Sequence, residues 1–348
     1  MSISSPTRPP SRAEVAHGRF ASPPRRPPVV AKVGGRELRS GQGLEDFVAW
    51  AAATVREGTP LVIVHGGGEE VSDLAERLGI PTLKVEGQRV TTPEVLPVVE
   101  GVLAGPVNLR LVSALNMAGV RAVGLTGVSA GCVVAREVKD GVLGLVGEPS
   151  DVDPQLVRDL HRVWRVPVFA PLASDGRGGV LNVNADLFAS GLAEALGGDL
   201  VLFTDVPGVL GPQGEVMARL APSRARDLLE DRTVHGGMVP KVEAALRVLE
   251  QGARGVWIGA LPPRGSKSLA GGTWFRKEPR APRRAHPSKA SGPPQLPPEG
   301  PPFPPPRPPS PGPGSPGPSS RRSLPRARSA PGPDDLTLLR TLTGSRGT

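Results

Sequence analysis

The sequence contains little cysteine, few aromatic residues and no long uninterrupted apolar run. Its 348 residues include one Cys, no Tyr, four Trp and seven Phe. A single thiol excludes a disulfide framework within the chain and a zinc site built from several cysteines. The small apolar neighbours of Cys132 predict a buried, inert thiol. No apolar run reaches the roughly 18 residues of a membrane span, and the Pro/Arg-rich start lacks a signal-peptide segment, so we expect a cytoplasmic protein without a membrane partner.

Proline and glycine are abundant, with 43 and 45 residues, but the prolines are unevenly distributed. Residues 277–348 hold 21 of them and show almost no aliphatic periodicity. Such a segment buries too little apolar surface to offset the entropy of ordering it. We therefore expect disordered tails at 1–28 and 277–348, and one compact α/β body at 29–276.

The net charge of +9 belongs to these tails and not to the body. Residues 29–276 carry 25 basic and 28 acidic side chains, a net of −3. A domain whose main function is to bind the phosphate backbone of nucleic acid usually concentrates Lys and Arg on its folded surface. Nucleic acid is therefore an unlikely partner for the body, although binding through the basic tails stays open.

Short β-branched runs that end in glycine alternate with helical stretches along the body. This βαβ series predicts a three-layer αβα sandwich with a mostly parallel central sheet. The Asp-Gly pair within Lys139–Gly141 also predicts a β-hairpin over 131–147. The other expected strands are 29–33, 61–65, 121–125, 166–170, 200–204 and 255–258, and the expected helices are 44–56, 69–78, 93–118 with a break near 105–106, one opened by Asp153-Pro154, 186–196 and 241–251.

Glycine-rich segments follow the first two predicted strands. The first is KVGG at Lys32–Gly35, and the second is HGGG at His65–Gly68, which leads into a helix. Adjacent glycines let backbone N–H groups approach an anion, and a helix N-terminus adds its unpaired N–H groups. Each segment alone is equally explained by a tight turn. Neither fits the dinucleotide or P-loop spacing.

Four further segments place charged or amide side chains in loops. GQRVT contains Arg89, whose guanidinium is suited to a carboxylate, and NVNAD contains Asn182 and Asp186 at a helix start. Alone, these residues also fit a solvated arginine and a helix cap. The last two segments are TDVPGV from Thr204 and GGMVPK, which ends at Lys241.

Taken in order, these six motifs resemble the amino-acid kinase family over about 29–276. GQRVT, together with the VLAG-x-VN pattern that ends at Asn108, favours the branch that phosphorylates N-acetyl-L-glutamate. The resemblance implies transfer of the γ-phosphoryl group of ATP to a γ-carboxylate in arginine biosynthesis, with Mg²⁺ carried on the ATP phosphates and no dedicated protein metal site. It also implies a substrate half at about 29–180, a nucleotide half at about 181–276, and a homodimer.

The same resemblance implies a role for each motif residue. Lys32 and Lys241 would stabilise the transferring phosphoryl group, and Asp186 would hold both lysines in place. Arg89 would bind the substrate α-carboxylate. Gly67 and Gly68 would donate backbone N–H groups to the substrate, and Asn182 would bond its polar end. Gly34 and Gly35 would donate N–H groups to the transferring phosphoryl group. The nucleotide site would be lined by Thr204, Asp205, Val206, Pro207, Gly208, Val209, Leu210, Thr233, Val234 and His235.

Two other functions remain open from the sequence. One is a kinase for an N-blocked, carrier-linked aminoadipate in lysine biosynthesis, which would need a basic docking rim around Arg89 and Asn182. The other is a non-catalytic module that retains the fold, which the presence of both lysines and Asp186 disfavours. The segment Val128-Ser129-Ala130 replaces a Lys-Asp pair common in similar sequences, so its loop contacts should differ.

Overall fold

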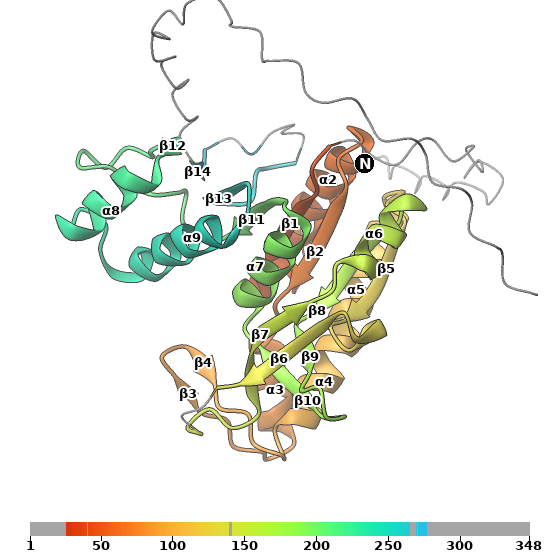
Figure 1. Cartoon of the computed structure of the whole chain (residues 1–348). Helices are drawn as coiled ribbons and strands as arrows, with labels where there is room; N and C mark the ends of the chain where they lie inside the picture. The colour runs from red at the N-terminus through yellow and green to blue at the C-terminus, as the bar shows by residue number, and fades with distance from the viewer. Residues whose placement is uncertain (1–25, 40, 139–140, 265–268, 270, 277–348) are drawn as a thin grey trace, which may run out of the picture. The chain divides into compact units, whose positions relative to one another are not determined.

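The computed structural model describes residues 26–276 apart from residues 40, 139–140, 265–268 and 270 (Figure 1). Almost all of the two predicted tails therefore lies outside the described residues, and the domain boundaries stay a prediction. Within the described part, an eight-stranded sheet has the strand order β12-β14-β13-β11-β1-β2-β8-β5. The sheet strands are β1 (Val29–Val33), β2 (Leu61–His65), β5 (Ala122–Thr126), β8 (Val166–Ala170), β11 (Asp199–Phe203), β12 (Arg219–Leu220), β13 (Gly255–Gly259) and β14 (Thr273–Phe275).

Neighbouring strands of this sheet run parallel except for β13 and β14. The central strand β1 pairs with β2 on one side and with β11 on the other. In sequence, the strands on the β2 side of β1 come first, and the strands on the β11 side follow. The carboxyl ends of β1 and β11 therefore flank a topological switch point, which is where open α/β sheets bind their ligands.

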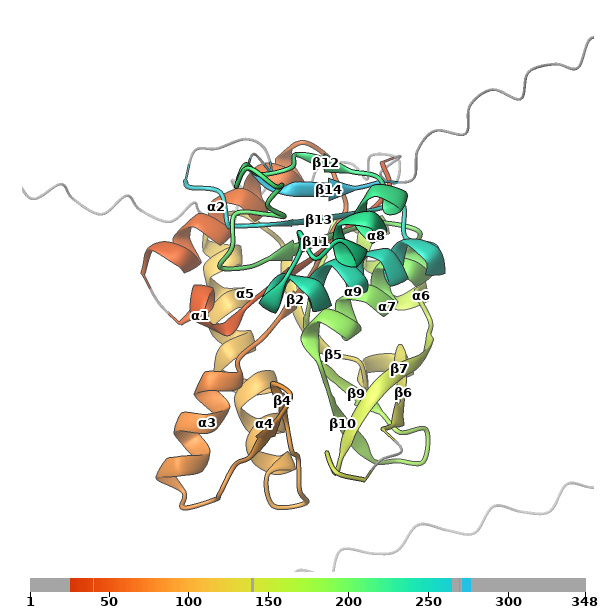
Figure 2. The same cartoon turned by 90° about the vertical axis from the view of Figure 1, so that its left-hand side faces the viewer.

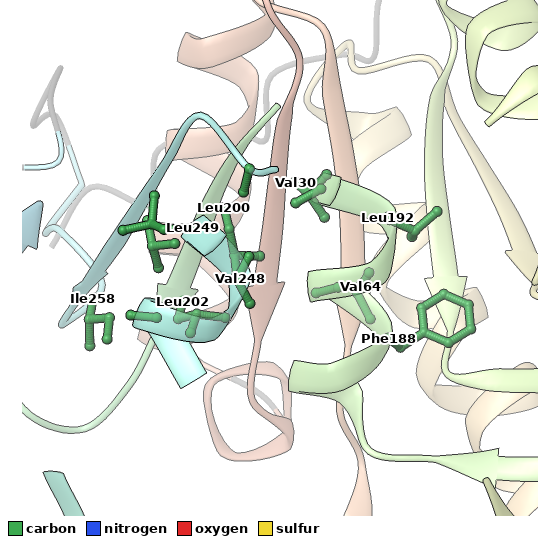
Figure 3. Close-up of a cluster of buried hydrophobic side chains, with 14 of the residues drawn as sticks. Val30, Val64, Phe188, Leu192, Leu200, Leu202, Val248, Leu249 and Ile258 are labelled. Carbon is green, nitrogen blue, oxygen red and sulfur yellow. The ribbon is translucent and has the colours of Figure 1, made fainter. Parts of the chain in front are cut away.

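Helices cover both faces of the sheet, which confirms the predicted αβα sandwich (Figures 1 and 2). Alternate β1 residues face opposite layers: Val30 packs in one core cluster and Ala31 in the other. Figure 3 shows Val30 and Val64 beneath α7, and Leu202 and Ile258 beside α9. One layer contains α2 (Gln42–Arg56) and α5 (Asn108–Met117), and the other contains α6 (Gln155–Arg162), α7 (Ala185–Leu196), α8 (Pro222–Glu230) and α9 (Val239–Gln251).

A second, smaller sheet is formed by strands that lie on either side of β8 in sequence. The strands β6 (Val133–Glu137), β7 (Val146–Val152), β9 (Leu172–Ser174) and β10 (Val180–Val183) close on one another. β6 and β7 are antiparallel, so the predicted strand pair is present, but it was wrong to end the hairpin at residue 147, since its second strand is Val146–Val152. β7 begins at Val146, because the backbone of Leu143 and Leu145 is hydrogen-bonded to Thr91 and not to β6.

The break predicted near residues 105–106 is present in the long helical region. α4 (Leu96–Val102) continues through a π-helical turn, Leu103–Val107, into α5, and Gly105 has non-helical dihedrals (φ −92°, ψ −113°) beside Pro106. Leu96–Met117 is the one helix among the described residues with the length and hydropathy of a membrane span. It contributes Leu111 and Leu115 to the core and carries Arg110, which pairs with Glu70, as expected of a core helix.

Shorter elements surround the carboxyl ends of the strands. α1 (Gly35–Leu38) follows β1, and α3 (Gly68–Arg77) follows β2 and packs against α4 through a separate apolar cluster. The hairpin of β3 (Lys84–Val85) and β4 (Gln88–Arg89) lies between α3 and α4 in sequence. The remaining short helices are Ser129–Gly131 and Gly236–Met238.

Candidate active site

Three parallel strands deliver the predicted motifs to one edge of the main sheet. β1 ends at Gly34-Gly35, β2 at Gly66–Gly68 and β11 at Thr204-Asp205. The first turns of α3, α7 and α9 lie at the same edge, so their unpaired N–H groups favour an anion there. Two adjacent clefts open at this edge, and they contain most of the predicted site residues.

The first, which we call the lysine cleft, has a volume of about 250 Å³ and contains both predicted lysines. Lys32 on β1 pairs with Asp186 on α7, with 3.1 Å between Nζ and Oδ1. Lys241, in the first turn of α9, lies 2.5 Å from Thr204 Oγ1 and 3.6 Å from Asp205 Oδ1. Two ammonium groups from opposite halves of the chain therefore enter one cleft, as predicted.

Asp186, which the resemblance implies holds both lysines, pairs with one of them in the described structure. Asp186 contacts Lys32, whereas the β11 loop holds Lys241. A hydrogen bond from Thr204, and then the charge of Lys241, lower the pKa of Asp205. The cap of α7 is Asn184, whose Oδ1 accepts from the backbone N–H of Asp186 at 2.8 Å. Capping by Asn184 leaves the Asp186 carboxylate available to Lys32.

The second, which we call the arginine cleft, has a volume of about 210 Å³. Its Arg89 is 8% exposed, and Nη2 donates to the carbonyl of Gly68 and, at 2.8 Å, to Ser72 Oγ. Nη1 is buried and has no hydrogen-bond partner among the residues that the structure describes. Burial lowers the pKa of Arg89, and none of the residues around the cleft is acidic. A buried guanidinium N–H without a partner is costly, so a ligand carboxylate would remove an existing penalty.

Asn182 lines the same cleft, and its Nδ2 donates to Thr91 Oγ1 at 3.0 Å. This bond leaves the amide oxygen of Asn182 as an acceptor for a ligand N–H. The predicted Gly67 and Gly68 also line the arginine cleft, and Gly34 and Gly35 line the lysine cleft.

The two clefts meet where the glycine loops touch. A Cβ added at Gly35 would lie 2.9 Å from the Cα of Gly67 and 3.0 Å from its N. Both of those neighbours are backbone atoms, so no side-chain rotation could relieve the contact. Because Gly35 has no side chain, the two glycine loops can lie in contact, and the two clefts that they line are neighbours.

A buried polar pair supports the HGGG loop from below. His65 and Asn108 are 0% and 4% exposed, and Asn108 Nδ2 donates to His65 Nε2 at 3.1 Å and to the carbonyl of Val168 at 3.0 Å. Because Nε2 accepts, the ring hydrogen lies on Nδ1, which donates to the carbonyl of Gly66 at 2.9 Å. Burial lowers the pKa of His65 to about 4, so the ring is neutral.

Several predicted nucleotide residues lie away from both clefts. Thr204 and Asp205 line the lysine cleft, whereas residues 206–210 and 233–235 line neither. Val209 and Val234 are buried, while Leu210 and His235 are exposed. Gly208 has a φ of +148°, and a Cβ there would approach Thr273, so this segment is packed against β14.

The cleft residues that the sequence reasoning missed include four polar ones close to its motifs. Arg36 and Glu37 line the lysine cleft, and Lys84 and Gln88, on the β3–β4 hairpin, line the arginine cleft. Arg36 directly follows the glycine pair, and Gln88 directly precedes Arg89, so proximity to a motif was the available signal. No group of three or more His, Cys, Asp or Glu residues in the described part of the chain is arranged to hold a metal ion.

Comparison with known proteins assigns this arrangement to a family. The model of the amino acid kinase family matches residues 27–260. The chain belongs to the amino acid kinase family. An acetylglutamate kinase from Paracoccus denitrificans is 41% identical over 232 residues, which cover 66% of this chain and 76% of that protein.

Solved structures of other proteins are similar as well. An N-acetylglutamate synthase from Neisseria gonorrhoeae, in complex with coenzyme A and N-acetyl-glutamate, matches with a TM-score of 0.63 and 26% identity, over 72% of this chain and 59% of that chain. A carbamate kinase from Giardia lamblia bound to AMP-PNP matches with a TM-score of 0.56 at 15% identity, over 75% of this chain and all of that chain. The second similarity concerns the fold alone.

Proposed function

We propose that this amino acid kinase is an acetylglutamate kinase, which transfers the γ-phosphoryl group of ATP to the γ-carboxylate of N-acetyl-L-glutamate. The observation that carries the proposal is the contact of Gly35 with Gly67, which joins a cleft for a small carboxylate to a cleft with two lysines. The 41% identity to an acetylglutamate kinase supports the choice of acceptor.

In this proposal the acceptor occupies the arginine cleft. Nη1 of Arg89 binds the α-carboxylate, and Asn182 bonds the N-acetyl amide. The γ-carboxylate then points across the glycine loops towards the lysine cleft. Because an ionised carboxylate carries no proton at neutral pH, attack on the phosphorus needs no general base, and Asp186 is free to position Lys32.

The nucleotide phosphates occupy the lysine cleft, where glycine amides and two lysines meet the charge that develops on the transferring group. Phosphoryl transfer depends mainly on such positioning and electrostatic stabilisation. The carboxylates that line the cleft include Asp186 and Asp205, and each already pairs with a lysine. Mg²⁺ would be carried on the ATP phosphates and would neutralise part of their charge.

A hydroxamate-trapping assay tests the proposal directly. Purified chain, ATP and Mg²⁺ are mixed with N-acetyl-L-glutamate, and the acyl phosphate is captured by hydroxylamine. We expect ATP-dependent hydroxamate from acetylglutamate and much less from N-acetyl-aminoadipate, whose side chain is one methylene longer. Equal or greater turnover of the aminoadipate compound would favour the lysine-biosynthesis alternative, and no turnover of either would favour a non-catalytic module.

We also propose that two chains associate through the β5 edge of the sheet. Among the described strands β5 pairs only with β8, so the sheet ends at this strand, where Asn116 binds the backbone N–H and C=O of Ala122. Leu109 and Met117 on the adjacent α5 are 66% and 68% exposed. Light scattering of the wild type and of Met117→Lys tests this: a dimer that the substitution weakens supports the proposal, and a wild-type monomer contradicts it.

A further inference from the structure

Arg36 is a third cation at the lysine cleft, and the kinase motifs do not account for it. It lies in the first turn after Gly34-Gly35 and lines the cleft with Lys32 and Lys241. Its side chain is 74% exposed, so it can move without disturbing the core. In the described structure its Nε donates to Glu69 Oε1 on α3 at 2.7 Å.

Two of the three cations pair with carboxylates that line the lysine cleft, whereas the partner of Arg36 lies outside it. Lys32 and Lys241 pair with Asp186 and Asp205, which line the same cleft. With Arg36 and Glu37 included, the charged residues around the cleft amount to three cations and three anions. A nucleotide with several phosphate charges therefore meets a cleft whose described residues have no net formal charge and whose three cations are all paired with carboxylates.

Arg36 is the cation that can turn at least cost. Its partner, Glu69, lies outside the lysine cleft and is shared with Arg39, whose Nη1 lies 3.4 Å from Oε2. If Arg36 leaves, Glu69 keeps Arg39, and the two carboxylates that pair with the cleft lysines keep their partners. The pKa of Arg36 is raised mainly by Glu69 and further by Asp205, which places the guanidinium within electrostatic range of the end of β11.

We propose that Arg36 exchanges Glu69 for the phosphates of the bound nucleotide and acts as a third phosphate-binding cation in the lysine cleft. A guanidinium suits this role because its planar set of N–H groups can bind two phosphate oxygens at once. The inference extends the proposed function and rests on its placement of the nucleotide phosphates in this cleft.

Arg39 provides a matched control, because it lies beside α1 and also binds Glu69 but does not line either cleft. Binding of AMP-PNP with Mg²⁺ is measured by calorimetry for the full-length wild type and for Arg36→Gln and Arg39→Gln. Arg36→Gln loses one charge-assisted contact, so it should bind AMP-PNP about tenfold more weakly than the wild type. We expect Arg39→Gln to stay within about twofold of the wild type.

Glu69→Gln separates phosphate binding from a structural role. If Arg36 binds phosphate, Glu69→Gln releases it and leaves the affinity for AMP-PNP unchanged or higher. If the Arg36–Glu69 pair only joins α1 to α3, then Glu69→Gln and Arg36→Gln weaken binding equally. That equality, or equal affinities for Arg36→Gln and Arg39→Gln, would overturn the inference.

The measurement does not depend on which acceptor is phosphorylated. In steady-state assays with acetylglutamate, Arg36→Gln should raise the KM for ATP about tenfold and leave the KM for the acceptor within about twofold. If the wild type fails to phosphorylate acetylglutamate yet binds AMP-PNP through Arg36, the proposed acceptor is wrong and the inference stands. If the wild type turns over and Arg36→Gln binds AMP-PNP as tightly, the inference alone fails.

Discussion

The stability of this kinase should fall as the pH drops from about 6.5 to about 4, because His65 is buried in its neutral form. Its Nε2 accepts from Asn108 and its Nδ1 donates to Gly66, so no acceptor is available for a second ring hydrogen. Burial is the largest cause that lowers the pKa to about 4, and Arg110 lowers it further while Glu70 opposes the shift.

The magnitude follows from the difference between the folded and unfolded states. In the unfolded chain His65 regains its ordinary pKa of 6.5. Between that value and about 4 the unfolded state binds more protons, so acid favours unfolding, whereas above pH 6.5 both states are neutral and no stability is lost. Each pKa unit corresponds to about 1.4 kcal/mol, so the full loss at the acid end is about 3 kcal/mol.

Urea unfolding followed by tryptophan fluorescence, at pH values from 7.5 to 4, measures this loss. His65→Asn keeps a donor near the Gly66 carbonyl but cannot take up a proton. Its free energy of unfolding should therefore fall by about 3 kcal/mol less than that of the wild type between pH 7.5 and 4. His235→Gln is the control, because His235 is exposed. The slope is compared and not the absolute stability, since His65→Asn also leaves a cavity. Parallel pH curves for the wild type and His65→Asn would refute the reasoning.

The remaining predictions concern single side chains. Lys32→Ala and Lys241→Ala should each lower kcat by about 10²–10³, because each removes a pre-organised cation; wild-type turnover in both would discard the proposed roles. Arg89→Lys should raise the KM for acetylglutamate about tenfold with a smaller effect on kcat, since an ammonium cannot replace the second N–H group; an unchanged KM would place the α-carboxylate elsewhere. Ala130→Gly should raise the free energy of unfolding by about 0.5–1 kcal/mol, because Ala130 has a φ of +52° that glycine adopts without steric cost; destabilisation in urea would contradict this. The thiol of Cys132, whose pKa burial raises to about 11, should react with a thiol reagent at pH 8 only in urea; rapid labelling of the native protein would show that it is accessible.

The local pattern of the sequence was enough for most of the main sheet. Strands such as β1 and β2 are mostly apolar runs followed by glycine, and such runs occur where a strand is buried on both faces. The second strand of the β6–β7 pair was misplaced because its position depends on Thr91, which is distant in sequence and binds the backbone of Leu143 and Leu145. Short strands such as β12 and β14 carry too few residues to show a period.

What the sequence by itself determined about the site is its inventory of groups: two lysines, Arg89, Asn182 and the glycine loops stand in motifs whose chemistry can be read residue by residue. Only the tertiary structure decided which groups are partners. It pairs Asp186 with Lys32 and gives Lys241 to Thr204 and Asp205, and it brings Arg36 to the cleft edge. The physical reason is that pairing depends on distances between strand and helix ends far apart in the chain, and a motif records only its own neighbours.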